Sequence, residues 1–233
     1  MAAATADSPD AVALEGVGRA YGERVALRDV TFTLPAGATV AVFGANGAGK
    51  TTLLRILAML LRPHAGVARV LGAALPREAW KARGQVGLLG HEPLLYRDLT
   101  ARENLRYHAR LHRVAPRRGD DLLERVGLAA RADDPVRTLS RGMAQRAAIC
   151  RTVLHDPSLL LLDEPLANLD PGGAAAVAPL IGRGSGHARV LISHDVEQGL
   201  AEADWVLGLR AGRQALWAPG DQVSAADVRG LYA

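Results

Sequence analysis

Short apolar runs alternate with amphipathic stretches along most of the chain. Alternating apolar and polar residues predict half-buried strands at 11–17 and 30–34, and the apolar run 38–43 predicts a strand buried on both faces. The same patterns predict further strands at 66–71, 85–89, 158–162, 189–192 and 205–209, and helices at 51–61, 100 to about 128, 141–155, 171–181, 196–202 and near the C-terminus. Strands and helices that alternate on both sides of a helical insert indicate an α/β core with a helical lobe.

The composition agrees with a globular protein. The chain has 233 residues, of which 49% are apolar and 22% charged, and this mix excludes disorder and a coiled coil. The apolar stretch 53–61 is too short to cross a membrane and is interrupted by Arg55. The N-terminus carries Asp7 and Asp10 and lacks an apolar core, so no secretory signal is expected. The single Cys150 fits a reducing compartment, and we expect a soluble, cytoplasmic protein.

The net charge of +4 says little about partners. Aromatic residues make up only 4% of the chain, so few are available to stack on bases, and we expect no nucleic-acid partner. The densest basic patch contains Arg110, His112, Arg113, Arg117 and Arg118. We interpret it as a solvated helix end, with lipid headgroups or an acidic partner surface as alternatives.

Residues 44–51, G-A-N-G-A-G-K-T, match the pattern G-x-x-x-x-G-K-[ST] in full. They follow an expected buried strand and precede an expected helix, the context in which this pattern binds phosphate. Glycines allow successive backbone N–H groups to point at phosphate oxygens, and the helix start adds the positive end of its dipole. Lys50 is expected to neutralise phosphate charge and Thr51 to place its hydroxyl on Mg²⁺.

The second strong signal is the segment 158–165, S-L-L-L-L-D-E-P. An apolar strand that ends in a carboxylate places Asp163 where it can reach a metal, directly or through water. Glu164 could accept a proton from an attacking water, a role worth about 10²–10⁴-fold in rate. The alternative is an acidic strand end that caps a neighbouring helix.

Together with three further motifs, these segments resemble the ATP-binding cassette of ABC transporters from residue 11 to about 219. Residues 139–143, L-S-R-G-M, lie some twenty residues before the acidic strand, where the family has its L-S-G-G-Q signature. Residues 167–170, A-N-L-D, resemble the D-loop, and 193–195, S-H-D, resemble the switch histidine. Tyr21 resembles the aromatic residue that stacks on adenine.

The resemblance implies the fold of a P-loop NTPase: a RecA-like core with a β-rich edge and an inserted α-helical subdomain at about 92–155. It implies a flexible tail at 1–10, one cassette domain at 11–219 and a short C-terminal helix at 220–233. It also implies a peripheral ATPase at the cytoplasmic face of the membrane. Because the chain has no expected membrane span, the permease subunits would be separate polypeptides.

The resemblance also implies site residues and cofactors. ATP and Mg²⁺ are the expected cofactors, with Thr51 and Asp163 holding the metal. Glu164, His194 and Asp163 are the expected catalytic residues. The remaining expected nucleotide contacts are Tyr21, Gly44, Asn46, Gly47, Gly49, Lys50, Thr52, Ser140, Gly142, His91 and Asp170. Ser140 and Gly142 would face the ATP of a second cassette, and Asp170 would contact that cassette across the interface, so a homodimer is expected.

Three positions depart from the family pattern. Arg141 replaces a signature glycine, and Met143 replaces a glutamine, which could alter contacts between subunits. His91 stands where most members carry a glutamine that touches Mg²⁺ and senses the membrane partner. A neutral imidazole suits hard Mg²⁺ less well than an amide oxygen. We expect His91 to keep the coupling role with a weakened metal role; the alternative is a loop histidine with no ligand.

Residues 90–93, G-H-E-P, and 98–105, D-L-T-A-R-E-N-L, have a narrower resemblance. They are similar to the haem-exporter ATPase of cytochrome c biogenesis. The expected function is therefore an ATP-hydrolysing subunit that energises an ABC transporter, and this narrower resemblance implies haem as the cargo. The alternatives are an exporter of another substrate and a soluble ABC ATPase that acts as a nucleotide-driven switch.

Overall fold

The computed structural model describes residues 10–232. The expected flexible tail, apart from Asp10, lies outside the described residues. The chain forms two compact units: unit 1 contains the residues up to Arg83 and from His187 onward, and unit 2 contains Gly84–Gly186. Unit 2 extends beyond the expected helical insert at 92–155, because it also holds the strands on either side of that insert. Among the described residues, no helix is long and apolar enough to cross a membrane.

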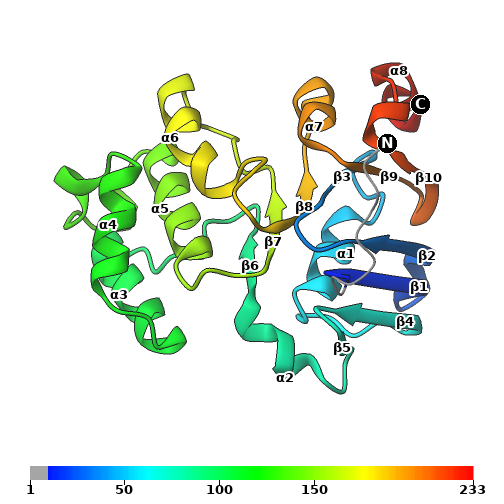
Figure 1. Cartoon of the computed structure of the whole chain (residues 1–233), viewed down its shortest axis with the longest axis horizontal. Helices are drawn as coiled ribbons and strands as arrows, with labels where there is room; N and C mark the ends of the chain where they lie inside the picture. The colour runs from blue at the N-terminus through cyan, green and yellow to red at the C-terminus, as the bar shows by residue number, and fades with distance from the viewer. Residues whose placement is uncertain (1–9, 233) are drawn as a thin grey trace. The chain divides into compact units, whose positions relative to one another are not determined.

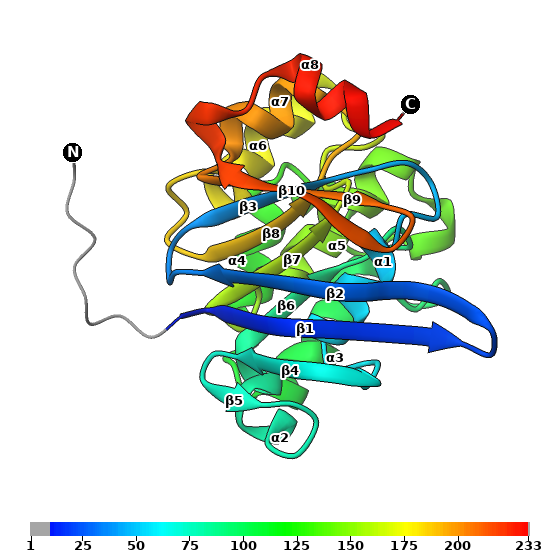
Figure 2. The same cartoon turned by 90° about the vertical axis from the view of Figure 1, so that its right-hand side faces the viewer.

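Unit 1 is built on a mixed sheet, with strands in the order β5-β4-β1-β2-β10-β9-β3-β8 (Figures 1 and 2). Its strands are β1 (Val12–Tyr21), β2 (Arg24–Leu34), β3 (Thr39–Phe43), β4 (Ala65–Val70), β5 (Ala73–Ala74), β8 (Ala188–Ile192), β9 (Trp205–Arg210) and β10 (Arg213–Pro219). The strands β5, β4, β1 and β2 are antiparallel, whereas β9, β3 and β8 are parallel. Figure 2 shows β1, β2 and β4 side by side at the antiparallel edge. The expected β-rich edge is therefore present.

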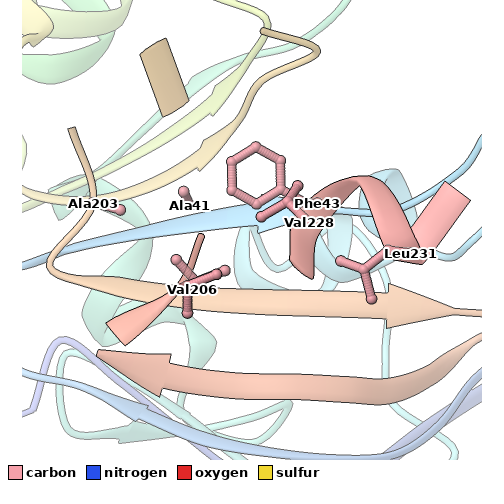
Figure 3. Packing of buried hydrophobic residues seen from close by; sticks show 7 residues of the cluster. Ala41, Phe43, Ala203, Val206, Val228 and Leu231 are labelled. Atoms are coloured by element: carbon pink, nitrogen blue, oxygen red, sulfur yellow. The ribbon is translucent and has the colours of Figure 1, made fainter. Parts of the chain in front are cut away.

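Four helices accompany this sheet among the described residues: α1 (Lys50–Leu57), α2 (Ala79–Ala82), α7 (Val196–Glu202) and α8 (Ala225–Arg229). The C-terminal segment packs on β3 and β9, where Val228 and Leu231 join Phe43 and Val206 in one buried cluster (Figure 3). Fully burying an apolar side chain of this size contributes about 1.5–3 kcal/mol. Val228 and Leu231 therefore fix the C-terminal segment to the strand that leads into the phosphate-binding loop.

Unit 2 contains a parallel pair of strands, β6 (Val86–Leu89) and β7 (Leu159–Asp163). Its helices are α3 (Ala101–His112), α4 (Arg117–Arg125), α5 (Arg141–Val153) and α6 (Pro171–Ile181) (Figure 1). Short 3₁₀ turns at Ala129–Arg131 and Val136–Thr138 connect α4 to α5. The helical lobe expected from the sequence thus has α3, α4 and α5 as its main elements.

Two expected helices differ from the structure, and one strand was missed. The single helix predicted from 100 to about 128 is two helices, because Arg113 ends α3 in the left-handed conformation and Pro116 precedes α4. The helix predicted to reach residue 61 ends at Leu57, and Met59 has a φ of 59°. Strand β10 was not predicted; it returns antiparallel to β9 after a turn at Gly212.

Three histidines and one arginine gather inside unit 2. The rings of His112 on α3 and His155 after α5 are stacked with their centroids 4.0 Å apart. Burial, followed by the charge of Arg151, lowers the pKa of His108 to about 4. Burial, followed by His112, lowers the pKa of His155 to about 4. Both rings are therefore neutral at pH 7 in the folded protein.

This cluster predicts a loss of stability in acid. Unfolded histidines have a pKa near 6.5, so between pH 6.5 and 4 the unfolded chain binds protons that the folded chain does not. The contribution of these rings is complete above pH 6.5 and is lost as the pH falls towards 4. We expect the denaturant midpoint of unfolding to differ less between pH 7.5 and pH 5 in a His108→Gln/His155→Gln double variant than in wild type. Equal pH dependence in the double variant and in wild type would contradict the prediction.

Candidate functional site

The expected phosphate-binding loop lies between β3 and α1, as the sequence predicts. A Cβ atom on Gly44, which has a φ of 145°, would lie 2.2 Å from the backbone oxygen of Leu209. A Cβ atom on Gly49, with a φ of 108°, would lie 2.6 Å from the backbone oxygen of Ala26. Both conformations and both close approaches require glycine. The loop is therefore held against β2 and β9 by contacts that only these two glycines permit.

The start of α1 offers groups that bind anions. Gly49 precedes the helix in the left-handed conformation, and no side chain of the described residues caps it. Lys50 is only 9% exposed, and its Nζ donates hydrogen bonds to the backbone oxygens of Gly44 and Ala45, at 2.5 and 3.1 Å. Thr51 is exposed and Thr52 half-buried on the first turn. Backbone N–H groups, a helix N-terminus and one ammonium group thus meet in a single loop.

His194 lies at the same edge of the sheet as this loop. Strands β3 and β8 are parallel, and Val42 is paired with Ile192. The residues that follow the two strands therefore leave the sheet together, with Gly44 in one segment and His194 in the other. Asp195, next to His194, caps α7 by accepting a hydrogen bond from the backbone N–H of Gln198 at 2.9 Å.

Tyr21 is the last residue of β1, and the residue is 43% exposed. It is paired across the β1–β2 hairpin with Arg24. The guanidinium carbon of Arg19 lies 5.1 Å from the centre of the Tyr21 ring, within the range of a cation–π interaction. The adenine-stacking candidate is thus an exposed ring beside a cation in unit 1.

The two acidic residues are at the end of β7 in unit 2. Strand β7 is buried along its whole length, and Asp163, its last residue, is only 8% exposed. Glu164 follows with a φ of 52°, in the left-handed region that non-glycine residues rarely occupy. Backbone strain of this kind costs about 1–3 kcal/mol and clusters at functional sites. Leu71 after β4 and Ala211 after β9 share this conformation, so it does not by itself identify Glu164 as catalytic.

The signature segment begins a helix, as predicted. Ser140 caps α5, and its Oγ accepts a hydrogen bond from the backbone N–H of Met143 at 3.2 Å. Asp170 caps α6 in the same way, accepting from the N–H of Gly173 at 2.8 Å. Both side chains therefore have a local structural role in addition to the expected role at the nucleotide.

The structure also shows contacts that the sequence analysis missed. A Cβ atom on Gly142 would lie 2.8 Å from the backbone oxygen of Asn168, so the signature helix touches the segment that resembles the D-loop. The buried Gln145 donates from Nε2 to the backbone oxygen of Pro165 at 3.0 Å. These contacts join α5 to the residues directly after Glu164. No spacing rule pointed to Gln145, because the contact forms only in the folded unit.

His91 is exposed at the edge of a hollow of about 720 Å³ within unit 2. The lining includes Leu94, Arg97, Val136, Arg141, Gln145 and Asn168. Leu94 is more than half exposed. The hollow thus brings His91 together with residues of the signature helix and of the D-loop-like segment.

A glycine loop between a buried strand and a helix, with a lysine at the first helical position, defines a P-loop nucleotide-binding protein. Comparison with protein families identifies the family within this class: the one described as "ABC transporter" matches residues 27–167. The chain belongs to this family, and it is an ABC-type ATPase that binds ATP.

Several relatives support this assignment. The chain is 37% identical to the daunorubicin resistance ATP-binding protein DrrA3 of Streptomyces coeruleorubidus, over 92% of this chain and 70% of that protein. It is 34% identical to the Nod factor export ATP-binding protein I of Rhizobium johnstonii, over 89% of this chain and 68% of that protein. It is also 36% identical to the phosphonates import ATP-binding protein PhnC of Anaeromyxobacter dehalogenans, of which it spans only 48%.

Solved structures give the same fold. The ATP-binding subunit of an ABC transporter matches with a TM-score of 0.86 and 26% identity, over 94% of this chain and 98% of that one. A dimeric ATP-binding cassette in a post-hydrolysis state, bound to ADP and Pi, also matches. Its TM-score is 0.81 and its identity 25%, over 89% of this chain and 98% of that one. The expected fold class, a P-loop ABC cassette, is confirmed.

Proposed function

We propose that this protein hydrolyses ATP to energise an ABC exporter whose membrane-spanning subunits are separate polypeptides. The phosphate-binding loop carries the proposal, because Gly44, Gly49 and the buried Lys50 form it with contacts that other residue types do not permit. The names of two relatives, in daunorubicin resistance and Nod factor export, favour outward transport. The protein would act at the cytoplasmic face of the membrane, attached through its permease partners.

The catalytic residues have the following proposed roles. Backbone N–H groups of Gly44, Asn46, Gly47 and Gly49, with Lys50 and Thr52, bind the phosphates. Tyr21 stacks on adenine, Glu164 polarises the attacking water, and His194 links the γ-phosphate to that water. Hydrolysis of this kind depends mainly on positioning and on charge stabilisation.

Mg²⁺ fits the oxygen donors of this chain. Thr51 offers a hydroxyl and Asp163 a carboxylate, and both are hard ligands. Among the described residues, no group of three or more His, Cys, Asp or Glu side chains could hold a metal alone. The Thr51 hydroxyl and the Asp163 carboxylate suit a Mg²⁺ ion that takes its other ligands from phosphate and water. When bound, the ion would neutralise charge on the phosphates.

The signature and D-loop residues act on a second copy in this proposal. Ser140 and Gly142 at the start of α5 would face the γ-phosphate bound by the partner cassette, and Asp170 would contact the partner across the interface. Asp170 uses Oδ1 to cap α6. A carboxylate has a second oxygen that can serve the contact between subunits.

His91 would couple ATP hydrolysis to the membrane partner, which we propose docks at the hollow lined by His91 and Leu94. The exposed Leu94 offers apolar surface for such a contact. A His91→Gln variant should change the stimulation of ATPase activity by the permease more than the basal rate. Unchanged basal activity and unchanged stimulation would remove His91 from the coupling.

Identifying the membrane subunits that bind this protein would indicate which cargo is transported. Affinity purification of the tagged protein from detergent-solubilised native membranes, followed by mass spectrometry, should recover small multi-spanning subunits. Companions from cytochrome c maturation would support the narrower haem-export proposal, which rests on His91 and its neighbours. Other permeases would identify a different exporter, and an importer's permease would overturn outward transport. A protein that comes without any membrane companion would overturn the transporter proposal in favour of a soluble nucleotide-driven switch.

A further inference from the structure

The tip of the β1–β2 hairpin is anchored by Arg19. The Nη1 group of Arg19 donates a hydrogen bond to the backbone oxygen of Arg62 at 2.9 Å and lies 2.6 Å from Nε2 of His64. The same guanidinium covers one face of the Tyr21 ring. The contacts with Arg62 and His64 fix the end of β1 to the segment that follows α1. The hairpin tip is therefore held in place.

This anchored tip places a second arginine at the phosphate-binding loop. Arg24 is the first residue of β2, directly across the hairpin from Tyr21. Its Nη2 atom lies 3.5 Å from the position that a Cβ on Gly47 would occupy. Two residues further along β2, the backbone oxygen of Ala26 makes the close approach to Gly49. The start of β2 thus follows the loop, with the guanidinium over its middle.

Among the residues that the structure describes, no ion pair includes Arg24. A guanidinium carries five donors in a planar fork that matches phosphate oxygens, and it keeps its charge at all physiological pH values. Lys50 differs, because its ammonium is buried beneath the loop and bonded to the oxygens of Gly44 and Ala45. Arg24 is exposed, so it can move onto a bound ligand without losing a partner.

We propose that Arg24 is a second cation of the nucleotide site, binding the phosphate chain from the side opposite Lys50, while Arg19 positions Tyr21 and the hairpin tip. The proposal rests on ATP binding by the phosphate loop and adds a residue to that site. The two arginines have different consequences. Arg24 acts through charge, so its effect grows with the number of phosphates. Arg19 acts through position, so its effect is the same for every adenine nucleotide.

Equilibrium binding of Mg-ATP and of AMP to the full chain separates these roles. Arg24→Gln should weaken ATP binding about 5- to 10-fold and AMP binding less than 2-fold, in the range of one charge-assisted contact. Arg24→Lys should recover part of the loss. Arg19→Gln should weaken ATP and AMP by equal factors. Arg28→Gln, at an exposed position further along the same strand, is the matched control and should bind ATP as wild type does.

Two further measurements complete the test. Added salt should weaken ATP binding more in wild type than in Arg24→Gln, because one screened contact has been removed. Thermal unfolding without nucleotide should be unchanged in Arg24→Gln, since its side chain is exposed. ATP affinity within 2-fold of wild type, or equal losses for ATP and AMP, would overturn the role of Arg24. Failure of the phosphate loop itself looks different: wild type and Lys50→Ala would then bind ATP equally poorly.

Discussion

Replacing Glu164 by glutamine should reduce ATP turnover by about 10²–10⁴-fold, the usual contribution of a general base, while ATP still binds. The amide has nearly the shape of the carboxylate but cannot take a proton from water. Glu164 lies directly after the last residue of β7, outside the phosphate-binding loop. We therefore expect the substitution to leave the proposed phosphate contacts of Lys50 intact. Phosphate release and equilibrium ATP binding, measured on the same preparation, check both parts.

The variant should also accumulate a nucleotide-bound dimer, because ATP held between two copies would no longer be hydrolysed. Size-exclusion chromatography with light scattering, with and without Mg-ATP, measures this directly. Glu197→Gln is the matched control, since that glutamate pairs with Arg229 on the surface of unit 1. Full turnover in Glu164→Gln would remove Glu164 from the chemistry. Loss of ATP binding together with turnover would assign it a structural role instead.

The candidate site could be predicted from the sequence wherever its chemistry is local. The phosphate-binding loop is one continuous segment between a strand and a helix, so residue order alone predicts the elements on both sides. The helix that begins after Ser140 and the strand that ends at Asp163 follow from the same local rules. The family resemblance supplied the roles of Tyr21 and His194, which residue patterns alone did not.

The missed features depend on contacts between segments that are distant in the sequence. Gly142 looked like a phosphate contact, whereas the structure also shows it packed against the backbone of Asn168. Gln145 and Arg24 carried no signal, because their neighbours are 20 and 23 residues away. The break between α3 and α4 was missed for a different, local reason. Apolar periodicity continues through residues 113–116, although Pro116 and the left-handed Arg113 interrupt the helix.

Gly44 packs against strand β9 and is also part of the phosphate-binding loop. We therefore expect Gly44→Ala to reduce both stability and ATP binding strongly. The added Cβ would lie 2.2 Å from the backbone oxygen of Leu209, far inside van der Waals contact and against an atom of strand β9 that cannot turn away. The φ of 145° adds backbone strain. Relief requires the loop to move off β9, which displaces the backbone oxygen that binds Lys50. We expect a loss of about 3 kcal/mol or more in stability, with ATP binding lost in parallel.

The matched control is Gly37→Ala. Gly37 also has a positive φ, 74°, but a Cβ there would meet nothing within 4 Å. This variant carries the cost of backbone strain without the collision, so it should unfold at a slightly lower denaturant concentration and bind ATP normally. Urea unfolding and ATP binding of both variants separate the two terms. If Gly44→Ala resembled Gly37→Ala in both measurements, the loop would be free to leave β9. Tight packing against that strand would then not be what shapes the phosphate site.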